Sequence, residues 1–324
     1  MKQRRPVSGA QFRLRYADYE ATIASVGASL RELRCAGRDL VVPFAADELR
    51  PAYRGATLAP WPNRVTDGRY HADGVDHQLP LTEPARGHAL HGLVAWLDFT
   101  GGDDAAQASR GAGGDQVVLA ATIEPQAGYP WRVAVETTYS LAHDGLTQTV
   151  ALTNLAGRPV PAGVGPHPYL VAGRGSLDDW TLELPATRVL EVTEDRLVPT
   201  GLREVSVDPG RFDFRSPRRL GEVEIDHAFT GLSIDEAGRA TVRLLAGDGR
   251  GVELSWDRAC PWVQIHTADL PGRRAEDGHR RGLAVEPMTC GPDAFNAHGA
   301  EAAGLWTLAP GETRAASWRI QAVG

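Results

Sequence analysis

The fold of this chain is decided by residues 131–154, which read WRVAVETTYSLAHDGLTQTVALTN. Side chains alternate along the first run, so that Arg132, Glu136 and Ser140 oppose a face made of Trp131, Val133, Val135, Thr137, Tyr139 and Leu141. A period of two residues is typical of a β-strand with one buried face. The pair Asp144-Gly145 follows, and Leu146, Val150 and Leu152 then share a face of the next run. Because Asp-Gly between two alternating runs is a strong hairpin signal, this stretch predicts an antiparallel hairpin.

The same signals recur on both sides of this hairpin. Further Asp-Gly pairs stand at Asp67-Gly68, Asp73-Gly74 and Asp248-Gly249. The last pair separates two alternating runs, 241–245 and 252–256, and residues 317–323 read as a closing strand. Helical periodicity is scarce, and its best candidate, 27–33, reads equally well as the end of a strand. The 36 glycines and 22 prolines favour many turns. We therefore predict an all-β fold, a large antiparallel β-sandwich of two extensive sheets.

Two polar stretches interrupt the predicted strands. Residues 101–114 and 270–282 are rich in Gly, Asp and Arg, and each lies between two strand-like runs. We interpret them as surface insertions and not as domain boundaries. No internal repeat of about 20 to 50 residues is evident. Because all-β folds often run past about 200 residues as one unit, the prediction is a single domain over residues 1–324.

Composition excludes several classes of protein. The 324 residues include 34 basic and 41 acidic side chains, for a net charge of −7. An acidic balance argues against nucleic acid or an anionic membrane as partner. Lys2 is the only lysine, which excludes Schiff-base chemistry. Cys35, Cys260 and Cys290 are too few and too scattered for a disulfide framework or a zinc cluster.

Targeting signals and common catalytic loops are also missing from the sequence. The basic N-terminus is not followed by an apolar run, and no stretch approaches the roughly 18 apolar residues that span a bilayer. We therefore expect a cytoplasmic protein. Neither a phosphate-binding glycine loop nor a Gly-x-Ser-x-Gly elbow occurs in its usual context.

Two residues are candidates for acid–base chemistry. His167 lies between Pro166 and Pro168, which hold the backbone extended and suit a positioned histidine. The alternative is a histidine satisfied by backbone partners. Glu286 follows an apolar run and precedes Pro287, so that partial burial would raise its pKa as a general base requires. The alternative for Glu286 is a solvated glutamate at a strand end.

Other polar residues of the same segments allow both functional and structural interpretations. His88 and His91 are three residues apart, as in some metal sites, but no further ligand stands at a suitable spacing, so we predict no metal. Arg64 either clamps ligand oxygens or pairs with an acid. Asp226 either accepts hydrogen bonds from vicinal hydroxyls or caps a turn. Trp61 and Trp262 either offer flat faces to a sugar ring or belong to the core.

Taken in order, these segments resemble a known family. The ordered motifs are Asn63-Arg64 with Gly68-Arg69-Tyr70, then Leu90-His91-Gly92, then Thr153-Asn154 with His167-Pro168-Tyr169, then Asp226-His227, then Glu286-Pro287 with Pro292-Asp293-Ala294-Phe295-Asn296. Their order and spacing resemble those of the aldose 1-epimerase (galactose mutarotase) family. The sequence departs from that pattern at Leu93, where the family usually has a second glycine after His-Gly.

The resemblance implies a β-supersandwich and a cofactor-free isomerase that interconverts the α and β anomers of a free sugar. Carried over residue by residue, it implies that Glu286 is the general base and His167 the general acid. It further implies substrate contacts by Asn63, Arg64, His91, Tyr169 and Asp226. The expected partner is a small-molecule sugar, and the expected state is a monomer or a weak homodimer.

Three other functions stay open at this point. A hexose-6-phosphate epimerase needs arginines at the far end of the cleft, for which Arg69 and Arg86 are available. A non-catalytic sugar-binding protein of the same fold has no need of an acid–base pair. A polysaccharide lyase or hydrolase needs a second catalytic carboxylate or a tyrosine, for which Asp226 and Tyr169 are available.

Overall fold

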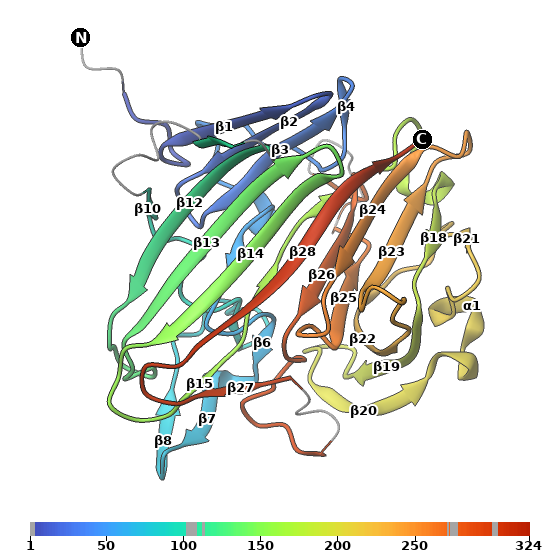
Figure 1. The fold of residues 1–324 in the computed structure, drawn as a ribbon. Coiled ribbons are helices and arrows are strands. Elements are labelled where there is room, and N and C mark those ends of the chain that lie inside the picture. The colour runs from blue at the N-terminus through green and yellow to red at the C-terminus, as the bar shows by residue number, and fades with distance from the viewer. Residues whose placement is uncertain (1–3, 102–108, 112–113, 271, 273–277, 300–303) are drawn as a thin grey trace.

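The computed structural model describes residues 4–101, 109–111, 114–270, 272, 278–299 and 304–324 (Figure 1). The regular secondary structure of the described residues is almost entirely β-strand. Its helical elements within these ranges are short: α1 (Pro209–Phe212) and the 3-10 turns η1 (Pro51–Tyr53), η2 (Thr66–Gly68), η3 (Leu177–Asp179) and η4 (Val205–Val207). No helix among these residues is long and apolar enough to cross a membrane.

Within the described residues, the largest sheet has ten antiparallel strands and extends across the molecule in Figure 1. Its order is β10, β12, β13, β14, β28, β24, β23, β18 and β21, with β11 added beside β12. The bounds are β10 (Thr100–Gly101), β11 (Ser109–Gly111), β12 (Gly114–Ile123), β13 (Val133–Ala142), β14 (Gly145–Asn154), β18 (Thr181–Glu183), β21 (Arg218–Arg219), β23 (Ala240–Leu245), β24 (Gly251–Trp256) and β28 (Thr313–Val323).

The predicted central hairpin is confirmed. Strands β13 and β14 pair from Val133↔Asn154 to Ala142↔Gly145, and the predicted face of β13 is buried. The second predicted hairpin is β23 with β24, and the predicted closing strand is the end of β28, which lies between β14 and β24. Local alternation therefore gave the correct strands and also the correct buried face.

A second sheet carries most of the polar candidates. Among the described residues it has six strands in the order β17 (Tyr169–Leu170), β26 (Leu283–Met288), β25 (Trp262–His266), β22 (Asp226–Leu232), β19 (Ala186–Val192) and β20 (Pro199–Glu204). One hydrophobic cluster contains Val263, Ile265 and Val285 of this sheet together with Leu244 and Leu254 of the large sheet. The two sheets therefore pack face to face, and the predicted β-sandwich is confirmed.

Smaller sheets complete the described fold. A four-stranded sheet consists of β1 (Gln11–Tyr16), β2 (Tyr19–Ala24), β3 (Ser29–Cys35) and β4 (Arg38–Asp39). Two-stranded pairs are formed by β5 (Thr57–Leu58) with β16 (Gly165–Pro166), β6 (Arg64–Val65) with β9 (Ala89–Leu90), β7 (Arg69–Ala72) with β8 (Val75–Gln78), and β15 (Val160–Ala162) with β27 (Trp306–Leu308). The pairs that contain β16, β6 and β9 hold segments of the candidate site.

Some local interpretations do not hold. Of the two readings of residues 27–33, the helix is wrong and the strand is confirmed, because most of these residues belong to strand β3, which pairs with β2 on one side and β4 on the other. Asp73-Gly74 is a tight hairpin turn between β7 and β8, but Asp67-Gly68 lies in the 3-10 turn η2 between strands that pair elsewhere. Much of the predicted insertions 101–114 and 270–282 falls outside the described residues.

Candidate active site

Glu286 lies in strand β26, which runs beside a second chain segment, residues 164–168. Val285 donates its backbone N–H to the carbonyl of Pro168 at 3.2 Å, and Thr289 donates to Val164 at 3.0 Å. Pro287 lies between these two donors on the same side of the strand, and because proline has no N–H this edge has a gap in its bonds at that position. Glu286 therefore lies inside the strand, not at its end as the sequence indicated.

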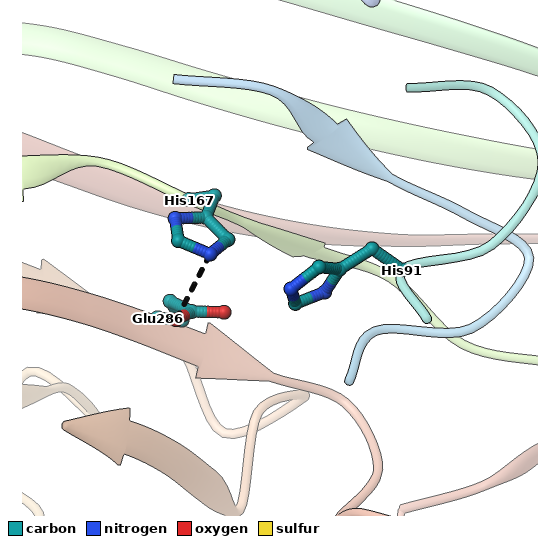
Figure 2. A group of neighbouring side chains, drawn as sticks. All are labelled: His91, His167 and Glu286. Atoms are coloured by element: carbon teal, nitrogen blue, oxygen red, sulfur yellow. Dashed lines mark ion pairs between the residues drawn. The ribbon is translucent and has the colours of Figure 1, made fainter. Parts of the chain in front are cut away.

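The backbone of His167 is fixed on its other side as well. His167 donates its N–H to the carbonyl of Ala56 at 3.1 Å, and its own carbonyl accepts from Gly55 at 2.8 Å. Both neighbours of His167 are prolines, which restrict the backbone further. The histidine is thereby held extended between two segments, with its ring directed toward β26 (Figure 2).

His167 and Glu286 form a buried pair. His167 Nε2 lies 3.4 Å from Glu286 Oε1, and the side chains are 6% and 2% exposed. The other ring nitrogen of His167, Nδ1, and the other carboxyl oxygen, Glu286 Oε2, are buried and have no hydrogen-bond partner among the described residues. Buried polar atoms are rarely left unpaired. The pair therefore contains two polar atoms whose hydrogen-bonding capacity is unused by these residues.

Burial moves the pKa values of the two groups in opposite directions. Desolvation raises the pKa of Glu286 well above its ordinary value, the nearby Asp226 adds to the rise, and Arg64 opposes it. Desolvation, with the coulombic effect of the nearby His266 next, lowers the pKa of His167 to about 3. The two shifts favour the uncharged forms of both groups, a protonated carboxyl and a neutral imidazole.

His91 faces the same pair from a different segment. Its ring lies 4.9 Å from that of His167, at nearly a right angle. His91 and Asn63 both have left-handed backbones, with φ of 62° and 58°. The backbone N–H of Asn63 donates to His91 Nδ1 at 3.2 Å, and the N–H of His91 donates to the Asn63 carbonyl at 2.8 Å. Burial lowers the pKa of His91 well below its usual value. His91 is therefore neutral and carries its proton on Nε2.

This tautomer decides whether the site suits a metal. Ligand atoms of His91, His167 and Glu286 lie within 4.8 Å of one another, which is close enough for three metal ligands. A histidine ligand needs a lone pair on the nitrogen that faces the metal. Because His91 Nδ1 accepts from Asn63, its Nε2 is the protonated nitrogen and acts as a donor. The residues present therefore fit a hydrogen-bonding site and not a metal site.

His88 and His91, which are three residues apart in the sequence, are not brought together for a common ligand. His88 Nδ1 accepts from the backbone N–H of Asp67 at 3.3 Å, and His88 Nε2 donates to the carbonyl of Arg196 at 2.8 Å. Both ring nitrogens of His88 are thus used to hold loops together. His88 has the structural role that the sequence left open.

Arg64 and Asp226 converge near Glu286. Arg64 Nη2 lies 3.9 Å from Asp226 Oδ2, which is too long for a direct hydrogen bond. Gln264 donates to Asp226 Oδ1 at 2.6 Å, and His266 Nδ1 lies 3.8 Å from the same oxygen. Burial opposes ionisation of Asp226, but His266, Arg64 and the bond from Gln264 together lower its pKa. Asp226 is therefore an ionised, partly exposed acceptor beside a guanidinium donor.

Aromatic rings line the histidines. Tyr169 stacks on His167 with the ring centroids 5.3 Å apart. Burial raises the pKa of Tyr169, so it remains a neutral phenol. Tyr53 packs against the edge of His91 at 4.7 Å and lies over His167 at 6.2 Å. Tyr53 and Ala52 both have positive φ, and left-handed backbones at non-glycine residues often cluster at functional sites.

A cleft of about 540 Å³ adjoins this group of side chains and shares Asp226 and His266 with it. The cleft wall carries charged and polar groups of both signs: Arg86, Thr193, Glu194, Arg211, Glu224 and His227. His227 Nδ1 accepts from the backbone N–H of Asp226 at 3.2 Å, so its proton also lies on Nε2. A polar wall of donors and acceptors suits a hydroxyl-rich ligand.

The structure brings six of the seven predicted site residues into one group of side chains: Arg64, His91, His167, Tyr169, Asp226 and Glu286. Asn63, the seventh, uses its side-chain oxygen to accept from Arg64 N–H at 2.9 Å and holds His91 through its backbone. Trp61 and Trp262 are 2% and 0% exposed and belong to the interior, so they offer no face to a sugar.

Sequence reasoning missed Glu83, Gln264, His266 and Tyr53 as site residues. Gln264 is directly opposite Glu286 in the β25–β26 pairing, and it is buried. The sequence signal that could have identified Gln264 and His266 is their alternation with apolar residues in β25. Glu83 and Tyr53 stand in loop-like segments with no periodicity, and nothing in the sequence distinguishes them.

Several known proteins are similar to this chain in sequence. A sequence model of a family described as aldose 1-epimerase matches residues 11–321. The chain is 37% identical over 290 residues to the uncharacterized protein YihR of Escherichia coli K12, covering 89% of this chain and 87% of that protein. It is 30% identical over 312 residues to the galactose mutarotase of Rattus norvegicus, covering 88% and 86%.

A solved structure has the same fold. The GalM/aldose epimerase homologue of C. elegans superposes with a TM-score of 0.81 over 97% of this chain and 98% of that chain, at 22% identity. Matching sequence over nearly the whole chain and matching architecture lead to one conclusion. The chain belongs to the aldose 1-epimerase family.

Proposed function

We propose that the protein is an aldose 1-epimerase that interconverts the α and β anomers of a free aldose by general acid–base catalysis. The observation that carries the proposal is the buried His167–Glu286 pair, 3.4 Å apart, whose pKa values are displaced in opposite directions. Two titratable groups whose environments separate their pKa values are the pattern of an acid–base pair. A protein that only binds sugar has no need of such a pair.

The reaction needs two proton transfers at atoms bonded to the same carbon. Glu286 removes the proton from the hydroxyl on C1 while His167 delivers a proton to the ring oxygen. The C1–ring oxygen bond breaks, C1 becomes an aldehyde carbon, and rotation about C1–C2 presents its other face. Reclosure reverses both transfers, so that the proton count of the pair is unchanged after each turnover.

The lowered pKa of His167 and the raised pKa of Glu286 favour a neutral imidazole beside a protonated carboxyl in the ligand-free protein. The mechanism needs the opposite arrangement, with the proton on His167, so that Glu286 can act as a base. The two arrangements differ only in the position of the proton, so no exchange with solvent is required. Hydrogen bonds from a bound sugar to the charged groups lower the cost of that arrangement.

The remaining polar groups bind and orient the sugar. His91 Nε2–H and the Arg64 guanidinium donate to hydroxyl oxygens, and ionised Asp226 accepts from hydroxyls. Tyr169 packs against His167 and limits the rotation of its ring. The direct test is polarimetry on freshly dissolved α-D-glucose and α-D-galactose. Enzyme-dependent acceleration supports the proposal, and buffer-like rates on every aldose tested would contradict it.

The pH dependence of kcat/KM gives a prediction that is specific to this pair. The pKa of His167 is lowered to about 3, far below the ordinary histidine value, and that of Glu286 is raised. We expect kcat/KM to stay flat through about pH 6.5, where an ordinary histidine titrates. The rate is to be measured from about pH 4.5 to 9, with the buffer rate subtracted at each pH. An inflection near pH 6.5 would show that His167 titrates normally.

A second candidate substrate is a hexose with an anionic group on C6, such as a hexose 6-phosphate. Arg86 and Arg211 both line the cleft that adjoins Asp226, and the buried Nε of Arg86 has no partner among the described residues. Arg69, by contrast, donates to Gln78 on the β7–β8 hairpin and does not line this cleft. Of the two arginines available from the sequence, Arg86 is therefore the one in position.

Replacement of Arg86 separates the two substrate classes. If the cleft binds a phosphate, Arg86→Ala removes a charge-assisted hydrogen bond, and kcat/KM for hexose 6-phosphate falls at least about tenfold relative to kcat/KM for the free hexose. The matched control is Arg69→Ala, for which the ratio stays constant. A wild type that is inactive on phosphorylated sugars dismisses the second candidate and leaves the first unaffected.

A further inference from the structure

Glu83 has a central position beside the site, although it contacts neither member of the acid–base pair. Its carboxylate accepts two hydrogen bonds from Arg64, from Nε at 2.8 Å and from Nη2 at 3.0 Å. It also accepts from Arg86 Nη1 at 2.9 Å. The side chains of Arg64 and Glu83 are 11% and 13% exposed. A two-point contact of this kind fixes the plane of a guanidinium as well as its position.

The backbone of Glu83 is itself held in place. Its N–H donates to the carbonyl of His88 at 3.0 Å, and its carbonyl accepts from Gly87 at 2.9 Å. His88 is fully buried and uses both ring nitrogens to bind neighbouring loops. The Glu83 carboxylate is therefore a fixed acceptor. Although burial opposes its ionisation, its bonds to Arg64 and Arg86 lower the pKa of Glu83, so it carries a charge at neutral pH.

Arg64 has a second carboxylate within reach. Asp226 Oδ2 lies 3.9 Å from Arg64 Nη2, beyond hydrogen-bond distance but close enough for strong attraction in a partly buried site. Direct pairing of Arg64 with Asp226 would use up the groups that bind sugar hydroxyls. Arg64 stays apart from Asp226 while its Nε and Nη2 are both bound by Glu83.

We infer that Glu83 is a positioning residue that holds Arg64 away from Asp226 and so keeps both available to the sugar. The inference rests on the proposed function. In this role Glu83 does not contact the substrate and acts only by positioning Arg64. Removal of the Glu83 charge leaves Asp226 as the nearest carboxylate to Arg64, and the two then pair with each other at the expense of the ligand.

The test is a double-mutant cycle with Glu83→Gln and Asp226→Asn, using the aldose with the highest wild-type kcat/KM. We expect Glu83→Gln alone to raise KM about tenfold and to change kcat by less than about threefold, because ligand binding is affected and the acid–base pair is not. In the Asp226→Asn background, the carboxylate that lies 3.9 Å from Arg64 is gone, so the same replacement raises KM by at most about twofold.

A role in stability alone makes a different prediction. Loss of a structural contact would change KM by the same factor in both backgrounds, and that outcome would overturn the inference.

Glu83→Asp keeps the charge but shortens the side chain, and we expect its KM between those of wild type and Glu83→Gln. Glu124→Gln is the control for removing a carboxylate from an arginine pair, because Glu124 binds Arg132 on the surface. If the wild type is inactive, both the proposed function and this inference are overturned. If the wild type is active and Glu83→Gln has the same KM as the wild type, the inference alone is overturned.

Discussion

Glu286→Gln is expected to reduce the rate of mutarotation by about 10³-fold or to the rate in buffer. Glutamine has nearly the shape of the glutamic acid but cannot take a proton from the C1 hydroxyl. A positioned acid or base contributes about 10² to 10⁴-fold, and here the same residue is needed for both opening and reclosure. Polarimetry on wild type and variant measures the loss. Glu253→Gln is the control, since Glu253 lies in strand β24, away from the site, and binds Arg243 of the neighbouring strand β23.

The stability of the same variant checks whether Glu286 is protonated in the folded state. A carboxyl group with a raised native pKa stabilises the fold below its unfolded pKa, and this stability is lost as pH rises toward the native value. Glutamine cannot ionise, so Glu286→Gln should gain stability relative to wild type between about pH 5 and pH 8. Thermal denaturation at several pH values measures the difference. A difference that does not change with pH would mean that the carboxyl is ionised in the folded protein at about pH 5.

The sequence predicts this fold well where strand neighbours are close in the chain. Residues 131–154 contain both strands, the turn and the buried face of the central hairpin, so their pattern includes nearly all of the information that the pairing needs. The six-stranded sheet is different. Its strand β22 pairs with β25 on one side and β19 on the other, and the register depends on contacts between distant segments. Alternation within one strand cannot reveal such partners.

The site could be predicted only in part for the same reason. His167 and Glu286 were visible as unusual residues in stiff or apolar surroundings, and the family motifs placed them in order. Their contact depends on residues 164–168 lying along β26, which no local pattern indicates. Glu83 is a more extreme case, because its significance arises from Arg64 in another segment. Residues that act through a neighbour show no chemical signature of their own in a single sequence.

His167→Gln is expected to lower the mutarotation rate by about 10²-fold or more, because His167 is the group that delivers a proton to the ring oxygen in the proposed mechanism. The control is His71→Gln, which replaces an exposed histidine of the β7–β8 hairpin that pairs with Asp76. If His167 only packs against Tyr169 and Tyr53, the variant should retain most of its kcat. The prediction is contradicted by a kcat within about threefold of wild type.

The pH dependence of stability in His167→Gln should have the opposite sign to that in Glu286→Gln. A histidine with a lowered native pKa destabilises the fold as pH falls below its unfolded value of about 6.5, since the unfolded chain then binds a proton that the folded chain refuses. From about pH 8 to pH 5 this amounts to about 2 kcal/mol, at 1.36 kcal/mol per pH unit. His167→Gln should therefore gain stability relative to wild type in acid, whereas Glu286→Gln gains it in alkali. Opposite slopes in the two variants would establish that the pair holds one proton, located on the carboxyl, before any sugar binds.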